Sequence, residues 1–298
     1  MKTIDPVSVA VCLITQYPDW YAGETRGISN IDKVRGDLAL DSIRASRKKG
    51  FVTFVGFHDN SPEFNKELKQ IEGIFLHRRE TEKSAPSKRQ LIEAASSHPE
   101  IKVICMMEPE KVSFVKDCLE LCATPILESN TDIVIPKRDD ALFRQTYPDY
   151  MYQSEVESIK LYNEELKAHG IIPQSHDGYD MFFGPRVFAN SPTIVDIFLA
   201  TYKLKIENIS FPDLYYDAEQ LSNTLFFPVV LALKKGVCVD SVIVPFHYPP
   251  SQKENEIKGA RAHFIEKRKA QRLGLIIELM HFATFLEKNQ GSRVQEKT

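Results

Sequence analysis

Two kinds of segment alternate along the first half of the chain. Short, nearly continuous apolar runs are typical of strands that are buried on both faces of a sheet. Longer segments with apolar residues at helical spacing lie between them. Strands alternating with helices predict βαβ units and a mainly parallel sheet. The strands are predicted at 7–15, 51–57, 73–77, 102–107 and 132–136, and the helices at 36–49, 63–71, 87–97 and 112–122.

The second half has a less regular pattern. Its apolar spacing predicts more helix than strand, and a single late strand. The polar tail at 288–298 is typical of a disordered segment. We expect two halves, 1–138 and 139–287, that form one continuous unit. The predicted elements are helices at 144–170, 191–204 and 260–286, a glycine-containing loop at 176–188, a loop and then a helix within 211–233, a strand at 237–246 and a polar loop at 247–256.

Composition and charge argue against several classes of protein. The chain has 298 residues, with 38 Lys and Arg against 41 Asp and Glu, so the net charge is −3. This balance gives no global basic field and argues against a nucleic-acid partner. The apolar runs are too short to span a membrane. The 5 cysteines lack zinc spacing and are expected to be reduced thiols in a cytoplasmic protein.

The ligand of an open α/β sheet binds beyond the carboxyl ends of the strands. Glu108 and Glu110 follow the apolar strand at 102–107, separated by Pro109. Hard cations such as Mg²⁺ and Mn²⁺ prefer oxygen ligands, so the pair is a candidate metal site that would bridge a substrate diphosphate. The alternative is a solvated turn with ordinary surface acids.

Polar residues at other element ends are candidates for an anion or nucleotide. Lys88 and Arg89 lie at the start of the helix at 87–97, where the helix dipole favours an anion, although charged helix starts are common. Asp59 ends the second strand and could contact a base or ribose, or cap the next helix. His247 follows the late strand and could ligate a metal or contact a phosphate, or be a surface histidine.

Two further segments could serve the reaction. Gly184 suggests a close backbone approach, and Arg186 an anion or sugar contact, or else the segment is a turn with a surface arginine. Asp217 and Glu219 precede a helix and could supply a general base for an acceptor hydroxyl, or cap that helix.

Taken in their order along the chain, these motifs resemble those of GT-A-type glycosyltransferases, the nucleotide-diphospho-sugar transferase superfamily. The resemblance spans roughly 7–275. Glu108-Pro109-Glu110 lies where the family usually has Asp-x-Asp, and Asp59 lies where the family has an acid that reads the base or ribose. Soluble, mannosylglycerate-synthase-like members are the most similar. Segments 132–138, 183–188 and 247–252 also resemble divergent bacterial members of the family.

The resemblance implies a GT-A-like, Rossmann-like sheet flanked by helices, with a helical C-terminal elaboration. It assigns 1–138 to nucleotide-sugar binding and 139–287 to the acceptor side. It implies Mg²⁺ or Mn²⁺ and a nucleoside-diphosphate sugar. The implied sites are Glu108, Glu110 and His247 for the metal, Thr15, Asp59, Lys88, Arg89 and Gly184 for the nucleotide, Arg186 for donor or acceptor, and Asp217 or Glu219 as base.

The leading hypothesis is a hexosyltransferase that uses a GDP- or UDP-sugar, with the acceptor left open. A sugar-phosphate nucleotidyltransferase is an alternative, but 16–20 lacks the glycine-rich loop of such enzymes. A degenerate binding protein is another, because glutamate replaces aspartate twice. A Gln-x-x-Arg-Trp motif is missing, which argues against a processive synthase. The long C-terminal helix would allow a homo-oligomer.

Overall fold

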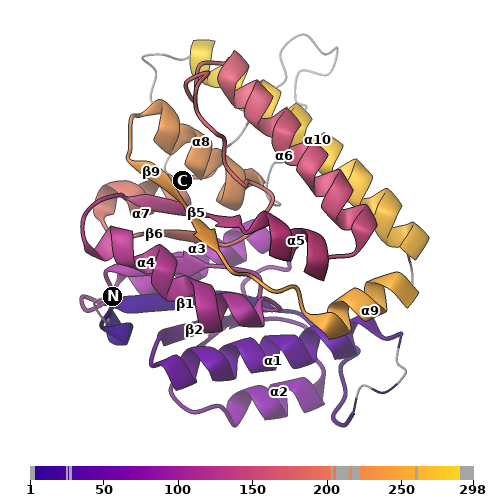
Figure 1. Cartoon of the computed structure of the whole chain (residues 1–298). Coiled ribbons are helices and arrows are strands. Elements are labelled where there is room, and N and C mark those ends of the chain that lie inside the picture. Colours follow the sequence, from indigo (N-terminus) through magenta and orange to yellow (C-terminus); the bar gives the residue numbers. More distant parts are fainter. Residues whose placement is uncertain are drawn as a thin grey trace.

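A computed structural model describes residues 4–24, 26, 29–202, 204–205, 215–216, 222–258 and 261–288. A seven-stranded sheet with strand order β3-β2-β1-β4-β6-β5-β9 lies at its centre (Figure 1). β6 runs antiparallel to β4 and β5, while the other neighbouring pairs are parallel. The strands are β1 (Val9–Thr15), β2 (Val52–Phe57), β3 (Ile74–Arg78), β4 (Val103–Met106), β5 (Ile133–Arg138), β6 (Arg186–Ala189) and β9 (Val239–Val244).

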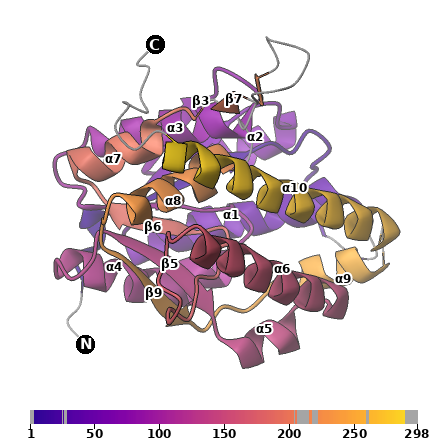
Figure 2. The same cartoon turned by 90° about the horizontal axis from the view of Figure 1, so that it is seen from above.

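Helices cover both faces of this sheet. α6 and α10 lie side by side, as both views show (Figures 1 and 2). The helices are α1 (Ile31–Lys49), α2 (Pro62–Lys69), α3 (Ser84–Ser96), α4 (Leu119–Leu127), α5 (Asp140–Thr146), α6 (Asp149–Ala168), α7 (Pro192–Leu199), α8 (Phe227–Lys234), α9 (Pro250–Lys258) and α10 (Arg261–Lys288). Short elements complete the described part: a 3-10 turn (Pro6–Ser8), two π-helical turns (Phe114–Cys118 and Ser222–Phe226) and the ribbon of β7 (Leu204–Lys205) with β8 (Tyr215–Tyr216).

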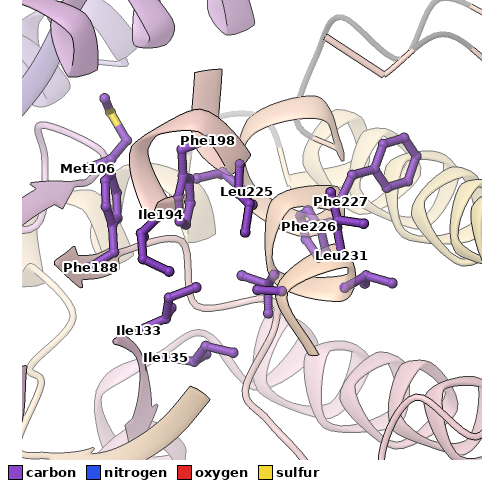
Figure 3. Packing of buried hydrophobic residues seen from close by; sticks show 14 of the residues in the cluster. Met106, Ile133, Ile135, Phe188, Ile194, Phe198, Leu225, Phe226, Phe227 and Leu231 are labelled. Carbon is purple, nitrogen blue, oxygen red and sulfur yellow. The ribbon is translucent and has the colours of Figure 1, made fainter. Parts of the chain in front are cut away.

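Successive residues of the central strands point to opposite faces of the sheet and belong to two different hydrophobic clusters. In β1, Ala10 and Cys12 face the cluster built with α3, α6, α7, α8 and α10. Val11 and Leu13 face the cluster built with α1, α2 and α4. Figure 3 shows part of the first cluster, where the rings of Phe188 and Phe198 stack with centroids 3.9 Å apart. Burial on both faces explains why β1 and β4 appear in the sequence as continuous apolar runs.

The predicted α/β class and mainly parallel sheet are confirmed. Ser61 caps α2 through its side chain, as its position before Pro62 predicts. Strand β6 was not predicted, because 176–188 reads as a loop entering an apolar segment. The helix predicted at 144–170 is wrong in one respect: it is two helices. Tyr147 adopts an extended conformation before Pro148, as expected of a residue that precedes proline.

Two more predictions about local structure need correction. The segment 247–256 is not all loop, because α9 begins at Pro250, where a missing N–H group costs nothing. The helix at 191–204 is shorter than predicted and ends at Leu199. In the described residues the cysteine thiols are free, and none of the helices combines the length and hydrophobicity that a membrane span requires.

Candidate functional site

A cavity of about 320 Å³ opens where several strands of the sheet end. Residues that follow the carboxyl ends of β4 and β9, and Arg138 at the end of β5, line it. Gly184 lines it just before β6, which runs the other way and therefore starts at this edge. Residues of α1, α6, α9 and α10 complete the wall. This is the position expected of a ligand site in an open α/β sheet, and the volume lies in the range of small-molecule sites.

Glu108 lines the cavity directly after β4. Its Oε2 atom is buried and has no hydrogen-bond partner in the described part of the chain. Burial raises the pKa of this carboxyl, but the positive charges of Lys111, Lys88 and Arg186 outweigh burial and hold the pKa below its usual value. Lys111 Nζ lies 3.9 Å from Oε2. Glu108 is therefore an ionised carboxylate with one oxygen that accepts no hydrogen bond from the described residues.

Glu110 also lines the cavity, but its Oε1 atom already has two partners. Nε of Arg35, on α1, forms an ion pair with it at 2.8 Å. The hydroxyl group of Tyr17 donates a hydrogen bond to the same oxygen at 3.0 Å. The side chain of Glu110 is only 8% exposed, whereas that of Arg35 is 44% exposed. The acid thus anchors a cation that extends into the cavity.

Among the described residues, four cationic side chains line the cavity, and they differ in whether their N–H groups already bind acidic side chains. They are Arg35, Lys111, Arg138 and Arg272. Arg138 and Arg272 are bound by Glu155, and Arg138 also by Asp180. Within the described residues, Lys111 Nζ and the two terminal amino groups of Arg35 donate to no protein acceptor. The cavity therefore offers N–H donors from Arg35 and Lys111 next to Glu108.

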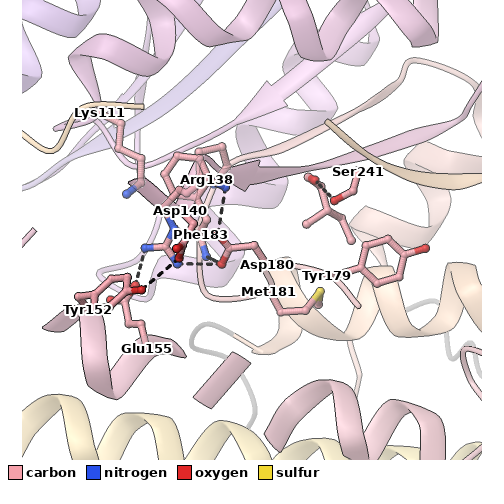
Figure 4. A network of polar contacts seen from close by, with 12 residues as sticks. Lys111, Arg138, Asp140, Tyr152, Glu155, Tyr179, Asp180, Met181, Phe183 and Ser241 are labelled. Carbon is pink, nitrogen blue, oxygen red and sulfur yellow. Dashed lines mark hydrogen bonds and ion pairs between the residues drawn. The ribbon is translucent and has the colours of Figure 1, made fainter. Parts of the chain in front are cut away.

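A buried polar network forms another part of the wall (Figure 4). The Arg138 guanidinium binds the carboxylate of Asp180 through two hydrogen bonds of 2.7 and 2.8 Å, and Nη1 binds Glu155 at 2.5 Å. The ring of Phe143 lies 3.6 Å from the guanidinium carbon. Asp180 raises the pKa of Arg138 against the effect of burial, which alone would lower it. The network fixes the end of β5 against α6.

Gly184 packs against Glu108. A methyl group at this position would overlap the Glu108 carboxylate. The close approach predicted from the glycine is thus made to the Glu108 side chain, and its contact with a nucleotide stays a prediction.

Replacing Gly184 with alanine should therefore displace the Glu108 carboxylate while the fold is kept, because that carboxylate ends a flexible, 36% exposed side chain. We expect a reaction that uses the Glu108 carboxylate to slow by about tenfold to a hundredfold, the cost of displacing a reacting group by about 1 Å. Initial rates and melting temperatures of Gly184→Ala measure both effects. Gly274→Ala, with open space around its new methyl group, is the control. Unchanged rates in Gly184→Ala would show that the position of Glu108 does not matter.

Lys88 lies on α3 behind the cavity and is 5% exposed. Burial lowers the pKa of its ammonium group to about 8, although the charge of Glu108 acts in the opposite direction. Arg186 adds to the lowering. Lys88 does not line the cavity, so its predicted contact with a nucleotide stays a prediction.

The lowered pKa of Lys88 makes a test of stability against pH possible. From about 8 to 10.5 the unfolded chain binds more protons at this site than the folded chain, so stability increases with pH in that window. Lys88→Met should raise the melting temperature at pH 7 in EDTA, and its advantage over the unmodified protein should shrink as pH rises through the window. Lys66→Met, at an exposed position of α2, is the control. An advantage that is constant with pH would contradict the assignment.

Thr15 and Asp59 lie at the ends of β1 and β2, outside the wall of the cavity. Thr15 is fully buried, and its hydroxyl donates to the carbonyl of Gly56 at 3.3 Å and accepts from Asn60 at 3.1 Å. Asp59 is exposed and has a positive φ of 50°. Ser61 rather than Asp59 caps α2, so the capping alternative for Asp59 is wrong. Its contact with a base or ribose stays a prediction.

Arg186 has a different role from the predicted contact with donor or acceptor. It is fully buried and does not line the cavity. Its guanidinium donates to four backbone carbonyls, those of Met181, Phe183, Pro185 and Leu225. Burial lowers its pKa to about 10. We therefore correct the interpretation of Arg186: it ties the loop before β6 to the chain before α8.

The remaining predicted residues are dispersed. His247 is exposed and lies outside the cavity wall, although its backbone exchanges hydrogen bonds with the hydroxyl of Ser113. Arg89 is half-buried on α3, also outside that wall. Among the described residues, no three His, Cys, Asp or Glu side chains converge as a metal-binding group. Asp217 and Glu219 lie outside the described residues.

Arg35, Lys111 and the Arg138 network were not predicted as site residues from sequence. Arg35 belongs to a helix rich in charged residues, so its pattern is that of a solvated helix face. Its proximity to Glu110 depends on the pairing of β1 with β4. Lys111 directly follows Glu110, which is the one local signal that could have identified it.

No protein-family model matches the chain, and no curated protein sequence matches it. Three solved structures are similar to this chain. One, from Desulfovibrio desulfuricans, is assigned as a nucleotide-diphospho-sugar transferase (9% identity, 90% of this chain and 98% of that chain, TM-score 0.42). The second is 4-diphosphocytidyl-2C-methyl-D-erythritol synthase from Anaerococcus prevotii (13% identity, 87% of this chain and 100% of that chain, TM-score 0.43). The third is a mannosyltransferase from Pyrobaculum calidifontis in complex with GDP-Man and Mn²⁺ (13% identity, 96% of this chain and 76% of that chain, TM-score 0.34). Because the TM-scores are below 0.5, these similarities define neither substrate nor reaction.

Proposed function

We propose that the chain is a glycosyltransferase that moves a sugar from a GDP- or UDP-linked donor to an acceptor hydroxyl. One observation carries the proposal: Glu108, with a buried oxygen that accepts no hydrogen bond within the described part of the chain, lines a cavity beyond the carboxyl ends of the sheet strands. The order of motifs along the chain, which resembles that of GT-A-type enzymes, supports it.

The residues present fit one divalent cation when a substrate supplies the other ligands. Mg²⁺ is commonly held by one or two carboxylates together with substrate phosphates and water. Glu108 would be the protein ligand, because its Oε2 is buried and without a partner. The cation, when bound, supplies charge stabilisation to the departing diphosphate. His247, exposed and outside the cavity wall, adds no ligand in the described arrangement.

The chain's own residues position the reactants. Phe182, Phe246 and Tyr248 give the cavity apolar surface that excludes water and can pack against a sugar ring. Gly184 leaves room for the Glu108 carboxylate. A base for the acceptor hydroxyl is still to be assigned, and Asp217 and Glu219 remain the candidates proposed from sequence.

A donor panel tests the proposal. Thermal shift with GDP-, UDP- and ADP-sugars, each with and without Mn²⁺, identifies a ligand through the rise in melting temperature that tight binding produces. Release of nucleoside diphosphate in the presence of acceptor or water then measures transfer or hydrolysis. Binding without turnover would favour a degenerate binding protein, and stabilisation by none of the donors would overturn the proposal.

A nucleotidyltransferase would behave differently. It would consume a nucleoside triphosphate and a sugar phosphate and release pyrophosphate. Measuring both products from the same preparation distinguishes the two reactions.

A further inference from the structure

Glu108 and Glu110 occupy one acid-x-acid motif, yet the structure gives them different surroundings. Glu108 has a buried oxygen without a partner and a lysine at 3.9 Å. Glu110 has an arginine at 2.8 Å and a tyrosine hydroxyl at 3.0 Å on one oxygen. The two carboxylates are therefore not equivalent ligands.

A divalent cation at Glu110 would lie beside the positive charge of Arg35, which contacts the carboxylate at 2.8 Å, whereas the ammonium group of Lys111 lies farther from Glu108, at 3.9 Å. Like charges repel over a few ångströms, most strongly where the surroundings exclude water. The ion pair also neutralises the charge that would attract the cation. A pyrophosphate group, by contrast, is attracted by Arg35, which presents two terminal amino groups that bind no described residue. The planar guanidinium matches phosphate oxygens in geometry.

We propose that Arg35 and Lys111 bind the diphosphate of the donor, and that Glu110, with Tyr17, is a positioning residue that holds Arg35. The assignment rests on the proposed function for the identity of the ligand. The two acids of the acid-x-acid motif then have different roles: Glu108 is the ligand of the cation, and Glu110 holds Arg35 in position. Lys111 lies over the rings of Phe183 and Phe246, at 4.9 and 5.3 Å from their centroids, which directs its ammonium group along the cavity wall.

The test is calorimetric binding of inorganic pyrophosphate to the full chain, first in EDTA and then as the Mn²⁺ complex. In EDTA, Arg35→Ala should weaken binding about tenfold or more, the usual effect of losing hydrogen bonds to a charged group. Arg44→Ala removes an arginine of the same helix that lies outside this cavity, and should bind like the unmodified protein. Equal affinity of Arg35→Ala and the unmodified protein would overturn the proposal.

Two further variants separate positioning from metal binding. In Arg35→Ala the carboxylate of Glu110 is left uncompensated and repels the anion, so the double variant Arg35→Ala/Glu110→Gln should recover part of the lost affinity in EDTA. Glu110→Gln should keep the gain in affinity that Mn²⁺ brings, whereas Glu108→Gln should lose it. If Glu110→Gln lost that gain as completely as Glu108→Gln, Glu110 would be a metal ligand and the proposal would fail.

The outcome is independent of turnover. Pyrophosphate binding through Arg35 in a protein that transfers no sugar would refute the proposed function and keep this assignment. Sugar transfer by a protein whose affinity for pyrophosphate is unchanged in Arg35→Ala would support the proposed function and refute this assignment. Melting temperatures of all variants identify any loss of affinity that is due to unfolding.

Discussion

Glu108→Gln is expected to reduce sugar transfer by about 10²–10³-fold, the usual cost of removing one group that stabilises charge in a transition state. The amide has nearly the size of the carboxylate but lacks the charge that attracts a divalent cation. Oε2 has no hydrogen-bond partner in the described structure, so the substitution removes only the long ion pair with Lys111, in which Glu108 is 36% exposed and its charge is screened by solvent. The melting temperature should therefore stay close to that of the unmodified protein.

The rate is measured as release of nucleoside diphosphate from the donor that the panel identifies, across a series of Mn²⁺ concentrations. Glu120→Gln is a matched control, because Glu120 is a surface acid paired with Lys49, outside the cavity. A Glu108→Gln protein that transfers sugar within a few-fold of the control would show that the cavity carboxylate is not required. Saturation at a higher Mn²⁺ concentration, with a recovered rate, would confine its role to metal affinity.

Much of the sheet could be predicted because burial leaves a strong trace in sequence. Strand β1 is buried on both faces, and its apolar run continues almost without interruption. Strand β6 leaves a weaker trace, because it has four residues and begins with Arg186, a charged residue that is fully buried. Its hydrogen bonds to carbonyl groups depend on tertiary structure that no local pattern encodes.

The candidate site could be predicted in part for the same reason. Glu108 and Glu110 follow an obvious strand, so their place at its carboxyl end was predictable, and both line the cavity. Their different environments were not, because Tyr17 and Glu110 are 93 positions apart and meet only when β1 pairs with β4. The predicted contact of Arg186 with donor or acceptor was wrong because the sequence does not distinguish a buried arginine that binds carbonyl groups from an arginine in an exposed turn.

The buried network around Arg138 leads to the second large effect. Arg138→Met should destabilise the fold by about 3–5 kcal/mol, because it leaves the buried Asp180 without its cation and leaves Glu155 with Arg272 alone. The Arg138, Asp180 and Glu155 side chains are 1%, 6% and 8% exposed, so solvent screens their charges little. The loss is measured as a change in the free energy of unfolding in urea. Lys137→Met, at the neighbouring position, removes a cation that forms no ion pair with the described residues and should change stability little.

The cause of this loss can be separated from lost packing. If uncompensated charge dominates, the double variant Arg138→Met/Asp180→Asn, which leaves Glu155 paired with Arg272, should recover a large part of the stability, since buried ion pairs are often replaceable by neutral groups of similar volume. If the contact of the guanidinium with Phe143 dominates, the double variant should be no more stable than Arg138→Met. We expect recovery, because Asp180 loses its cation while methionine keeps much of the contact with the ring. A loss below 1 kcal/mol in Arg138→Met would show that the network is not needed to hold β5 against α6.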